Sequence, residues 1–169
     1  LKSLTRLERL YLNNNQLSGH IPALNTLNRL EHLCLSYNYL SGTIPDITPL
    51  PHLENLLLNH NELIGKIPDL SQKLKRLYLD NNQLSGVIPD LKVLPNLRCL
   101  SLHNNQLCGT IPDFSLPTDR YSGDERNLME WVSLHNNQLS GTIPLCLTLL
   151  KNLTHLSIHN NHLMTNDKR

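Results

Sequence analysis

Three histidines form the pattern in this sequence that could most directly support chemistry. His103, His135 and His159 each follow a serine by two residues. A serine and a histidine on one side of a strand could act as nucleophile and general base, and imidazoles in a row could bind Zn²⁺ or Cu²⁺. No acid accompanies these histidines in the sequence, and ligands in line do not surround an ion tetrahedrally. The sequence therefore predicts no catalytic site, no metal site and no cofactor.

The histidines belong to a phrase that recurs along the chain. Its template is L-x-x-L-x-L-x-x-N-x-L-x-G-x-I-P, as in LRCLSLHNNQLCGTIP at 97–112. A period of about 23 residues predicts a solenoid of stacked coils. Other copies occupy 7–22, 30–45, 53–68, 74–89 and 129–144, and a last copy begins at Leu153 without the final Gly-x-Ile-Pro. The template asparagines are Asn15, Asn38, Asn61, Asn82, Asn105, Asn137 and Asn161, spaced 23, 23, 21, 23, 32 and 24 residues apart.

We predict a single solenoid domain of seven repeats. The spacing of 32 residues marks an insertion at 113–128, which could be either a solvated loop or a binding loop. The chain begins at Leu1 inside a repeat, and neither end resembles a cap. We therefore expect a segment of a longer protein, with further repeats or subunits at both ends. The predicted repeats span about 1–23, 24–46, 47–69, 70–90, 91–113, 114–146 and 147–169.

Each position of the template has a physical role. The two leucines of L-x-L point inward from a short strand, and the residue between them points outward. The asparagine can hydrogen-bond backbone groups within its own turn and those of the next coil. The glycine allows a positive φ, and the proline fixes φ. One coil cannot bury its own apolar face, so the coils must share a continuous core.

The pattern resembles the leucine-rich repeat family. The phrase Leu-Ser-Gly-x-Ile-Pro, at 40–45, 84–89 and 139–144, is similar to the plant-type subclass found in ectodomains of receptor-like proteins and kinases. The resemblance implies an α/β-type repeat solenoid, which is a curved right-handed superhelix with a parallel concave β-sheet and few or no regular helices. It also implies a second short strand at the Gly-x-Ile-Pro segment.

The outward strand residues would form the concave face. Tyrosine, tryptophan and arginine are the residue types that dominate protein interfaces. The N-terminal half of the face mixes Tyr, Arg and Asp, whereas the C-terminal half repeats Ser-x-His-Asn-Asn. The histidines should stack about 4.8 Å apart, which is the strand spacing, and would make that half sensitive to pH near 6. The candidate contact residues are Arg9, Tyr11, Tyr37, Arg76, Tyr78, Asp80, His103, Trp131, His135 and His159.

Trp131 can be read in two registers. The register set by Asn137 places Met129, Val132 and Leu134 inward and Trp131 on the face. A slip at the insertion would instead turn Trp131 inward. We favour the exposed register, because side-chain alternation follows from the strong Leu-His-Asn-Asn-Gln-Leu phrase.

The bulk composition excludes some partners and leaves the compartment open. A net charge of +1 indicates neither nucleic acid nor an anionic membrane as a partner. No apolar run approaches the roughly 18 residues that span a bilayer, so no membrane insertion is predicted for this segment. The sequon Asn152-Leu153-Thr154 is a possible glycosylation site and favours the cell surface. The four cysteines share no spacing, so they do not indicate disulfides and fit an intracellular complex equally well.

These observations favour a non-enzymatic module that binds a protein or peptide on the concave face. One alternative is a structural subunit of a larger assembly whose solenoid ends are covered by partners. The other is a protein inhibitor of a secreted enzyme.

Overall fold

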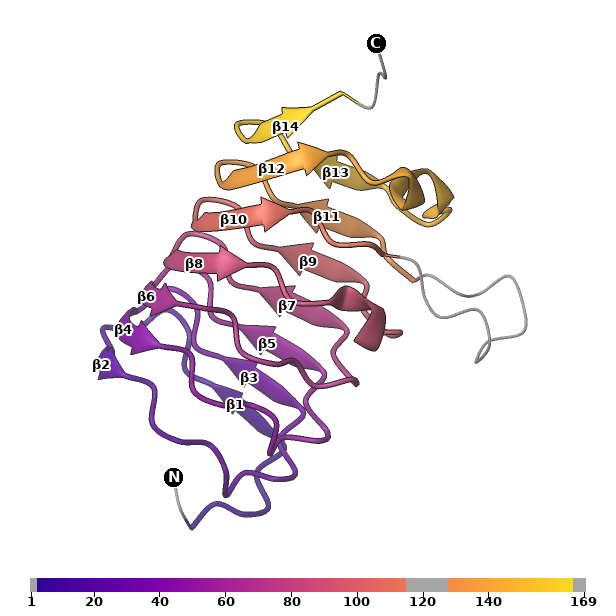
Figure 1. Cartoon of the computed structure of the whole chain (residues 1–169). Helices are drawn as coiled ribbons and strands as arrows, with labels where there is room; N and C mark the ends of the chain where they lie inside the picture. Colours follow the sequence, from indigo (N-terminus) through magenta and orange to yellow (C-terminus); the bar gives the residue numbers. More distant parts are fainter. Residues whose placement is uncertain (1–2, 115–127, 166–169) are drawn as a thin grey trace.

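The computed structural model describes residues 3–114 and 128–165, which form a β-solenoid (Figure 1). In this part of the chain, the main sheet has seven parallel strands in the order β1-β3-β5-β7-β9-β11-β13. These strands are β1 (Arg9–Tyr11), β3 (His32–Cys34), β5 (Asn55–Leu57), β7 (Arg76–Tyr78), β9 (Cys99–Ser101), β11 (Trp131–Ser133) and β13 (His155–Ser157). Each strand contains only the residues around the first leucine of L-x-L, so the sheet is narrow and long.

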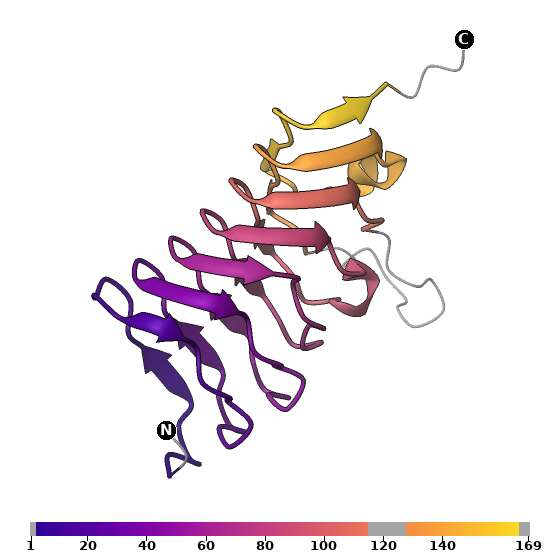
Figure 2. The same ribbon diagram turned by 60° about the vertical axis from the view of Figure 1, so that its left-hand side comes forward.

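A second parallel sheet runs along the flank of the solenoid, where the family resemblance implies one. Its order is β14-β12-β10-β8-β6-β4-β2, and the coils stack in chain order with the two termini at opposite ends (Figure 2). Its strands are β2 (Ser18–His20), β4 (Tyr39–Thr43), β6 (Glu62–Gly65), β8 (Gln83–Val87), β10 (Gln106–Thr110), β12 (Gln138–Thr142) and β14 (His162–Met164). The described residues contain no α-helix, only the 3-10 helices η1 (Leu91–Val93) and η2 (Leu145–Leu149).

The two sheets differ in register. Template-equivalent residues pair directly in the main sheet, where Trp131 lies beside Cys99 on one side and His155 on the other. In the flank sheet the pairing is offset by two residues, so that Cys108 pairs with Val87. The main sheet therefore stacks equivalent side chains into straight columns, and the flank sheet does not.

Leucine and isoleucine fill the space between the sheets and the connecting segments. Leu77, Leu79 and Leu84 are almost fully buried, as the template predicts, and so are the apolar residues Leu91 and Leu94 that precede the next strand. Burying one such side chain stabilises the fold by about 1.5–3 kcal/mol. The leucines of the outermost coils are more exposed, because each has a neighbouring coil on one side only within the described residues.

The template asparagine joins adjacent coils. Asn105 donates from Nδ2 to the carbonyl oxygens of Leu102, in its own turn, and Leu79, in the preceding coil, at 3.0 Å each. Its Oδ1 accepts the backbone N–H of Leu84 at 2.9 Å. The expected hydrogen bonds within the turn are confirmed, but the expectation of bonds to the next coil is wrong. The bonded coil is the preceding one, because the side chain leans back along the solenoid axis.

Each coil also fits against its neighbour at a glycine. Gly109 has a φ of +78°, and a Cβ at this position would lie 2.9 Å from Val87 Cγ1. Gly141 has a φ of +77° and faces Thr110 in the same way. Glycine is therefore required at this position for two reasons. It adopts a positive φ without strain, and it leaves room for the side chain from the preceding coil that covers it.

We expect Asn105→Ala to lower the free energy of unfolding by about 2–3 kcal/mol, because it leaves one buried N–H and two carbonyl groups without this partner. Denaturation in urea would measure the change. Gln106→Ala, one residue away and exposed, is the matched control and should change the stability by less than about 0.5 kcal/mol. Equal effects of the two substitutions would contradict the role assigned to the asparagine.

Candidate binding face on the main sheet

The outward side chains of the main sheet and of the turns after its strands form four columns. The first column is Arg9, His32, Asn55, Arg76, Cys99, Trp131 and His155; the second is Tyr11, Cys34, Leu57, Tyr78, Ser101, Ser133 and Ser157. The third is Asn13, Ser36, Asn59, Asp80, His103, His135 and His159; the fourth is Asn14, Tyr37, His60, Asn81, Asn104, Asn136 and Asn160. We call these four columns the binding face.

Aromatic and basic side chains dominate the N-terminal half of the binding face. Arg9 and Tyr11 lie exposed on β1, and Tyr37 is 50% exposed in the turn after β3. Tyr37 stacks on His60, with ring centroids 4.2 Å apart. His60 was not a predicted site residue, although its place one coil beyond Tyr37 in the same column is a signal that could have identified it.

Arg76 and Tyr78 lie on β7, in the middle of the face. Arg76 is exposed and donates to Asn55 Oδ1 at 3.4 Å, whereas Tyr78 is half-buried. Burial raises the pKa of Tyr78 to about 12, with a further contribution from Cys99 beside it, and Arg76 opposes this shift. Tyr78 is therefore a neutral phenol at any physiological pH and offers a hydrogen-bonding hydroxyl to a partner.

Trp131 lies on the face, so the exposed register is confirmed. Its side chain is 42% exposed, while Met129, Val132 and Leu134 are buried. The indole stacks on the ring of His155 in the next coil, with centroids 3.6 Å apart and planes 11° from parallel. This stacking holds the tryptophan in one orientation and leaves its opposite side toward Cys99.

Asp80 was predicted as an exposed contact residue, and the structure corrects this prediction. Its side chain is buried, with 6% of the residue exposed, and accepts a hydrogen bond from Asn81 Nδ2 at 2.9 Å. Its Oδ2 lies 3.7 Å from Nε2 of His103 and 4.0 Å from Nε2 of His60. Adjacent coils of the main sheet are only about 4.8 Å apart, so short side chains are covered by taller ones from the neighbouring coils. Other outward residues buried in this way are Cys34, Ser36, Asn55, Ser101 and Ser133.

The C-terminal half of the face holds a continuous hydrogen-bonded stack, which we call the serine–histidine ladder. It consists of Ser101, His103, Ser133, His135, Ser157 and His159. The imidazole rings stack as predicted, with centroids 4.3 Å apart for the first pair and 4.5 Å for the second. Every serine Oγ lies 3.0–3.2 Å from an Nδ1 atom, and the later two serines each bridge two histidines.

A row of asparagines runs beside the ladder in the fourth column. All seven residues of this column have a positive φ of 53–57°, a conformation that asparagine tolerates better than most residues. Asn104 donates to Asn81 Oδ1 at 2.7 Å, and Asn160 donates to Asn136 Oδ1 at 2.6 Å. The side chains are thus aligned in one direction along the solenoid.

Two of the ladder's histidines, His103 and His135, are disfavoured in their protonated form in the free chain. Burial lowers the pKa of His103, and His60 lowers it further, although the carboxylate of Asp80 acts in the opposite direction. Burial also lowers the pKa of His135, and so do His103 and His159 on either side of it. Positive charges on stacked rings repel one another, so protonation of one ring opposes protonation of the next.

Asp80 completes an arrangement that the sequence alone does not indicate. Ser101, His103 and Asp80 follow one another in the order of a hydrolase triad. However, Ser101 is buried, and 3.7 Å from Nε2 to the carboxylate exceeds hydrogen-bond length. Within the described residues, no group of three or more His, Cys, Asp or Glu is placed to hold a metal ion. The ladder is built as a hydrogen-bonded surface rather than as a nucleophile.

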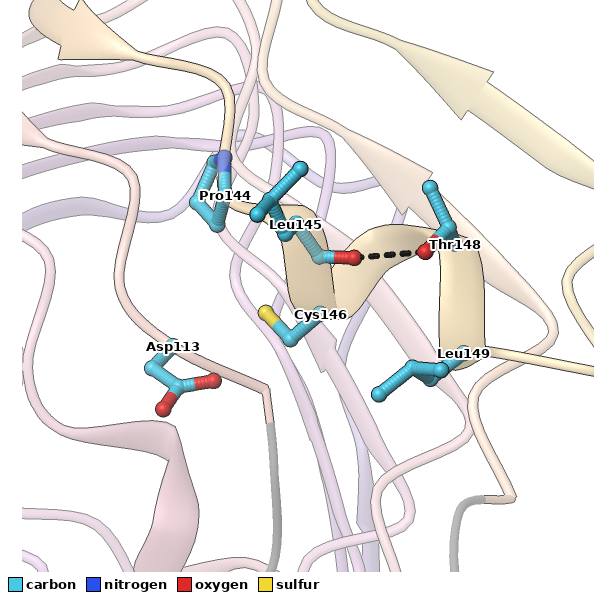
Figure 3. Close-up of a pocket in the computed structure, with 6 residues that line it drawn as sticks. All are labelled: Asp113, Pro144, Leu145, Cys146, Thr148 and Leu149. Atoms are coloured by element: carbon cyan, nitrogen blue, oxygen red, sulfur yellow. Dashed lines mark hydrogen bonds between the residues drawn. The ribbon is translucent and has the colours of Figure 1, made fainter. Parts of the chain in front are cut away.

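Other predicted features lie away from the binding face. Asn152 is exposed in the turn before β13, and its glycosylation stays a prediction. None of the four cysteines forms a disulfide in the part of the chain that the structure describes. Most of the insertion, 115–127, lies outside the described residues. An open cavity of about 370 Å³ lies beside η2 and is lined by Asp113, Pro144, Leu145, Cys146, Thr148 and Leu149 (Figure 3).

Family comparisons agree with the geometry of the coils. The family model described as Leucine Rich Repeat matches residues 6–27, 29–49, 52–74 and 129–150, and the model described as Leucine Rich repeats (2 copies) matches 72–116. These matches cover well over half of the chain, which therefore belongs to the leucine-rich repeat family. No curated protein matches the chain.

Its structural neighbours include ectodomains of plant receptor kinases. The chain is 38% identical to PEPR1, which was solved with AtPEP1, and the two structures superpose with a TM-score of 0.85. The matched region covers 96% of this chain and 22% of the PEPR1 chain. It is 36% identical to the ectodomain of the Arabidopsis receptor kinase HAESA, which was solved with an IDA peptide hormone, with a TM-score of 0.84. The matched region covers 95% of this chain and 26% of the HAESA chain. Pollen Receptor Kinase 3 is 34% identical to this chain, with a TM-score of 0.79. The matched region covers 96% of this chain and 79% of the Pollen Receptor Kinase 3 chain.

The chain thus spans about a quarter of the length of PEPR1 and HAESA. None of the helices in the described ranges has the length and apolar character needed to cross a membrane.

We expect the folded chain to lose stability as the pH falls from 7.5 to 5. Because folding lowers the pKa of His103 and His135, the unfolded chain binds more protons as the pH drops below about 6.5, the ordinary pKa of histidine. The melting temperature of His135→Gln should fall less over this range than that of the unsubstituted chain. Thermal unfolding followed by circular dichroism at several pH values would measure both.

His162→Gln, on the flank sheet, is the matched control for that experiment. If it reduces the pH dependence as much as His135→Gln does, the effect does not come from the ladder.

Proposed function

We propose that this chain is a non-enzymatic recognition module that binds a protein or peptide on the binding face of the main sheet. The observation that carries the proposal is the set of Arg, Tyr and Trp side chains, half-buried or exposed, that are held along one rigid parallel sheet. They are Arg9, Tyr11, Tyr37, Arg76, Tyr78 and Trp131. Such side chains provide most of the binding energy in protein interfaces, since they combine a large apolar area with few rotatable bonds.

The face is also ordered before any partner binds. Trp131 is held by His155, Tyr37 is held by His60, and the strands beneath them are paired on both sides. A partner would therefore lose little of its binding energy to ordering these side chains. The serine–histidine ladder and the row of asparagines beside it keep the polar groups of the face hydrogen-bonded to one another.

The structural neighbours support the same proposal. PEPR1 was solved with AtPEP1 and HAESA with a peptide hormone. Both are more than 35% identical to this chain over almost all of its length. An extended peptide lying across the parallel strands would run along the columns over several coils, and could contact Tyr78 on β7 and Trp131 on β11 together.

We expect Trp131→Ala and Tyr78→Ala each to weaken partner binding by tenfold or more, because each removes a large aromatic side chain from the face. Selection from a random peptide display library at pH 7.5 would supply the ligands. The chain contains a single tryptophan, so fluorescence of Trp131 reports binding directly in the unsubstituted chain and in Tyr78→Ala.

The matched control is Leu149→Ala, which removes an exposed apolar side chain on η2, away from the main sheet. It should leave affinity unchanged, and all three variants should keep the circular dichroism spectrum of the folded chain. Unchanged affinity in both Trp131→Ala and Tyr78→Ala, or a library that yields no ligand, would contradict recognition on this face.

A further inference from the structure

The serine–histidine ladder leaves one edge of its rings available. The Nδ1 atoms of His103, His135 and His159 are all engaged by serine hydroxyls, which fixes the orientation of each ring. Nε2 of His103 faces Asp80. Nε2 of His135 and of His159 has no hydrogen-bond partner among the described residues. Two ring nitrogens in adjacent coils therefore remain free to contact a partner.

The protonation state of these rings depends on what lies against them. Two unit charges about 4.4 Å apart repel by about 1 kcal/mol in water and about 4 kcal/mol at an effective dielectric constant of 20. The ionisable groups around the ladder are Asp80, His60 and His155, and only Asp80 is an acid. Asp80 lies beside His103, at one end of the stack. Burial and the rings on either side lower the pKa of His135, so a further negative charge placed beside it would favour its protonated form.

We propose that His135 and His159 form a binding row for an acidic peptide segment, and that this binding takes up protons. The proposal rests on the recognition function proposed above and specifies the partner's chemistry for the C-terminal half of the face. Carboxylates placed at the free Nε2 atoms would accept hydrogen bonds from protonated rings and offset the repulsion between them. The serine oxygens on the opposite edge can accept from Nδ1–H of a protonated ring, so the ladder does not have to rearrange.

An extended acidic segment fits this row. In an extended chain, side chains on one face repeat about every 6.7 Å, and the flexible glutamate side chain can adjust this spacing to rings whose centroids lie 4.5 Å apart. Glutamate has an ordinary pKa of about 4.3 and histidine of about 6.5. At pH 5.5 the segment is therefore ionised, and a carboxylate held against an imidazole favours the protonated form of that ring.

The direction of the pH dependence follows from these groups. A bound carboxylate raises the pKa of the histidines it contacts above that in the free chain, so the complex binds more protons than its separate parts. Affinity therefore increases as the pH falls from 7.5 to 5.5. A stack of neutral rings that bound a partner only by aromatic contact would show no such increase.

The probe is the peptide Ac-(Glu-Gly)₃-NH₂, compared with Ac-(Gln-Gly)₃-NH₂, titrated into the chain by calorimetry at pH 5.5 and 7.5. We expect the glutamate peptide to bind at least tenfold more tightly at pH 5.5 than at pH 7.5. The glutamine peptide should show no comparable change. The double variant His135→Gln/His159→Gln should lose the pH dependence, and the control His162→Gln should keep it.

Equal affinity of the glutamate peptide at both pH values, or pH dependence that persists in the double variant, would overturn the acidic-segment proposal. The display selection, repeated at pH 5.5, separates this failure from failure of the recognition function. Ligands that require Trp131 and Tyr78 but show no enrichment in Asp and Glu at pH 5.5 would refute the acidic preference while leaving recognition intact. If the library yields no ligand, recognition fails, and the peptide titration still decides whether the row binds acids.

Discussion

The hydrogen bonds of the inward asparagines are the constraint on which the rest of the structure depends. From Asn38 onward, each amide ties its own turn to the preceding coil, with donors and an acceptor used together, as at Asn105. A strand of three residues has too few backbone hydrogen bonds to fix its own register. The asparagine in the turn fixes the register of the strand, and this register directs the two leucines of L-x-L into the core. Straight columns on the main sheet are a consequence of this alignment.

Column alignment gives ordinary side chains collective properties. One serine and one histidine on a strand make a local hydrogen bond, whereas the same pair repeated in three aligned coils makes a ladder with shared serine bridges. The proximity that builds the ladder also opposes protonation of its members. In the N-terminal half, each column holds residues of different types. Their alignment produces single stacked pairs, such as Tyr37 with His60, rather than a continuous ladder. The two halves therefore suit different parts of a partner.

The periodic features of the molecule could be predicted from the sequence, and the non-periodic ones could not. Strand positions, the leucine core, the histidine stack and the exposure of Trp131 follow from the template, because each depends on alternation within one coil. The burial of Asp80 depends on the heights of its neighbours in adjacent coils, and its approach to His103 depends on the curvature and stacking of the sheet. The asparagine bonds were placed on the wrong neighbour for the same reason, since the direction of lean is a three-dimensional property. Inside the insertion no template residue sets a register.

The glycine contacts on the flank sheet have a consequence for how such a chain can change over evolutionary time. Val87 covers Gly109, and Thr110 covers Gly141, so each coil is shaped by the residue that its predecessor presents. Duplication or recombination can join two coils that were not neighbours before. The glycine of one coil then meets a side chain that was not selected to fit against it. The heritable unit is thus the junction between two coils, and repeats that carry compatible residues at this junction can be exchanged while the face on the other sheet varies independently.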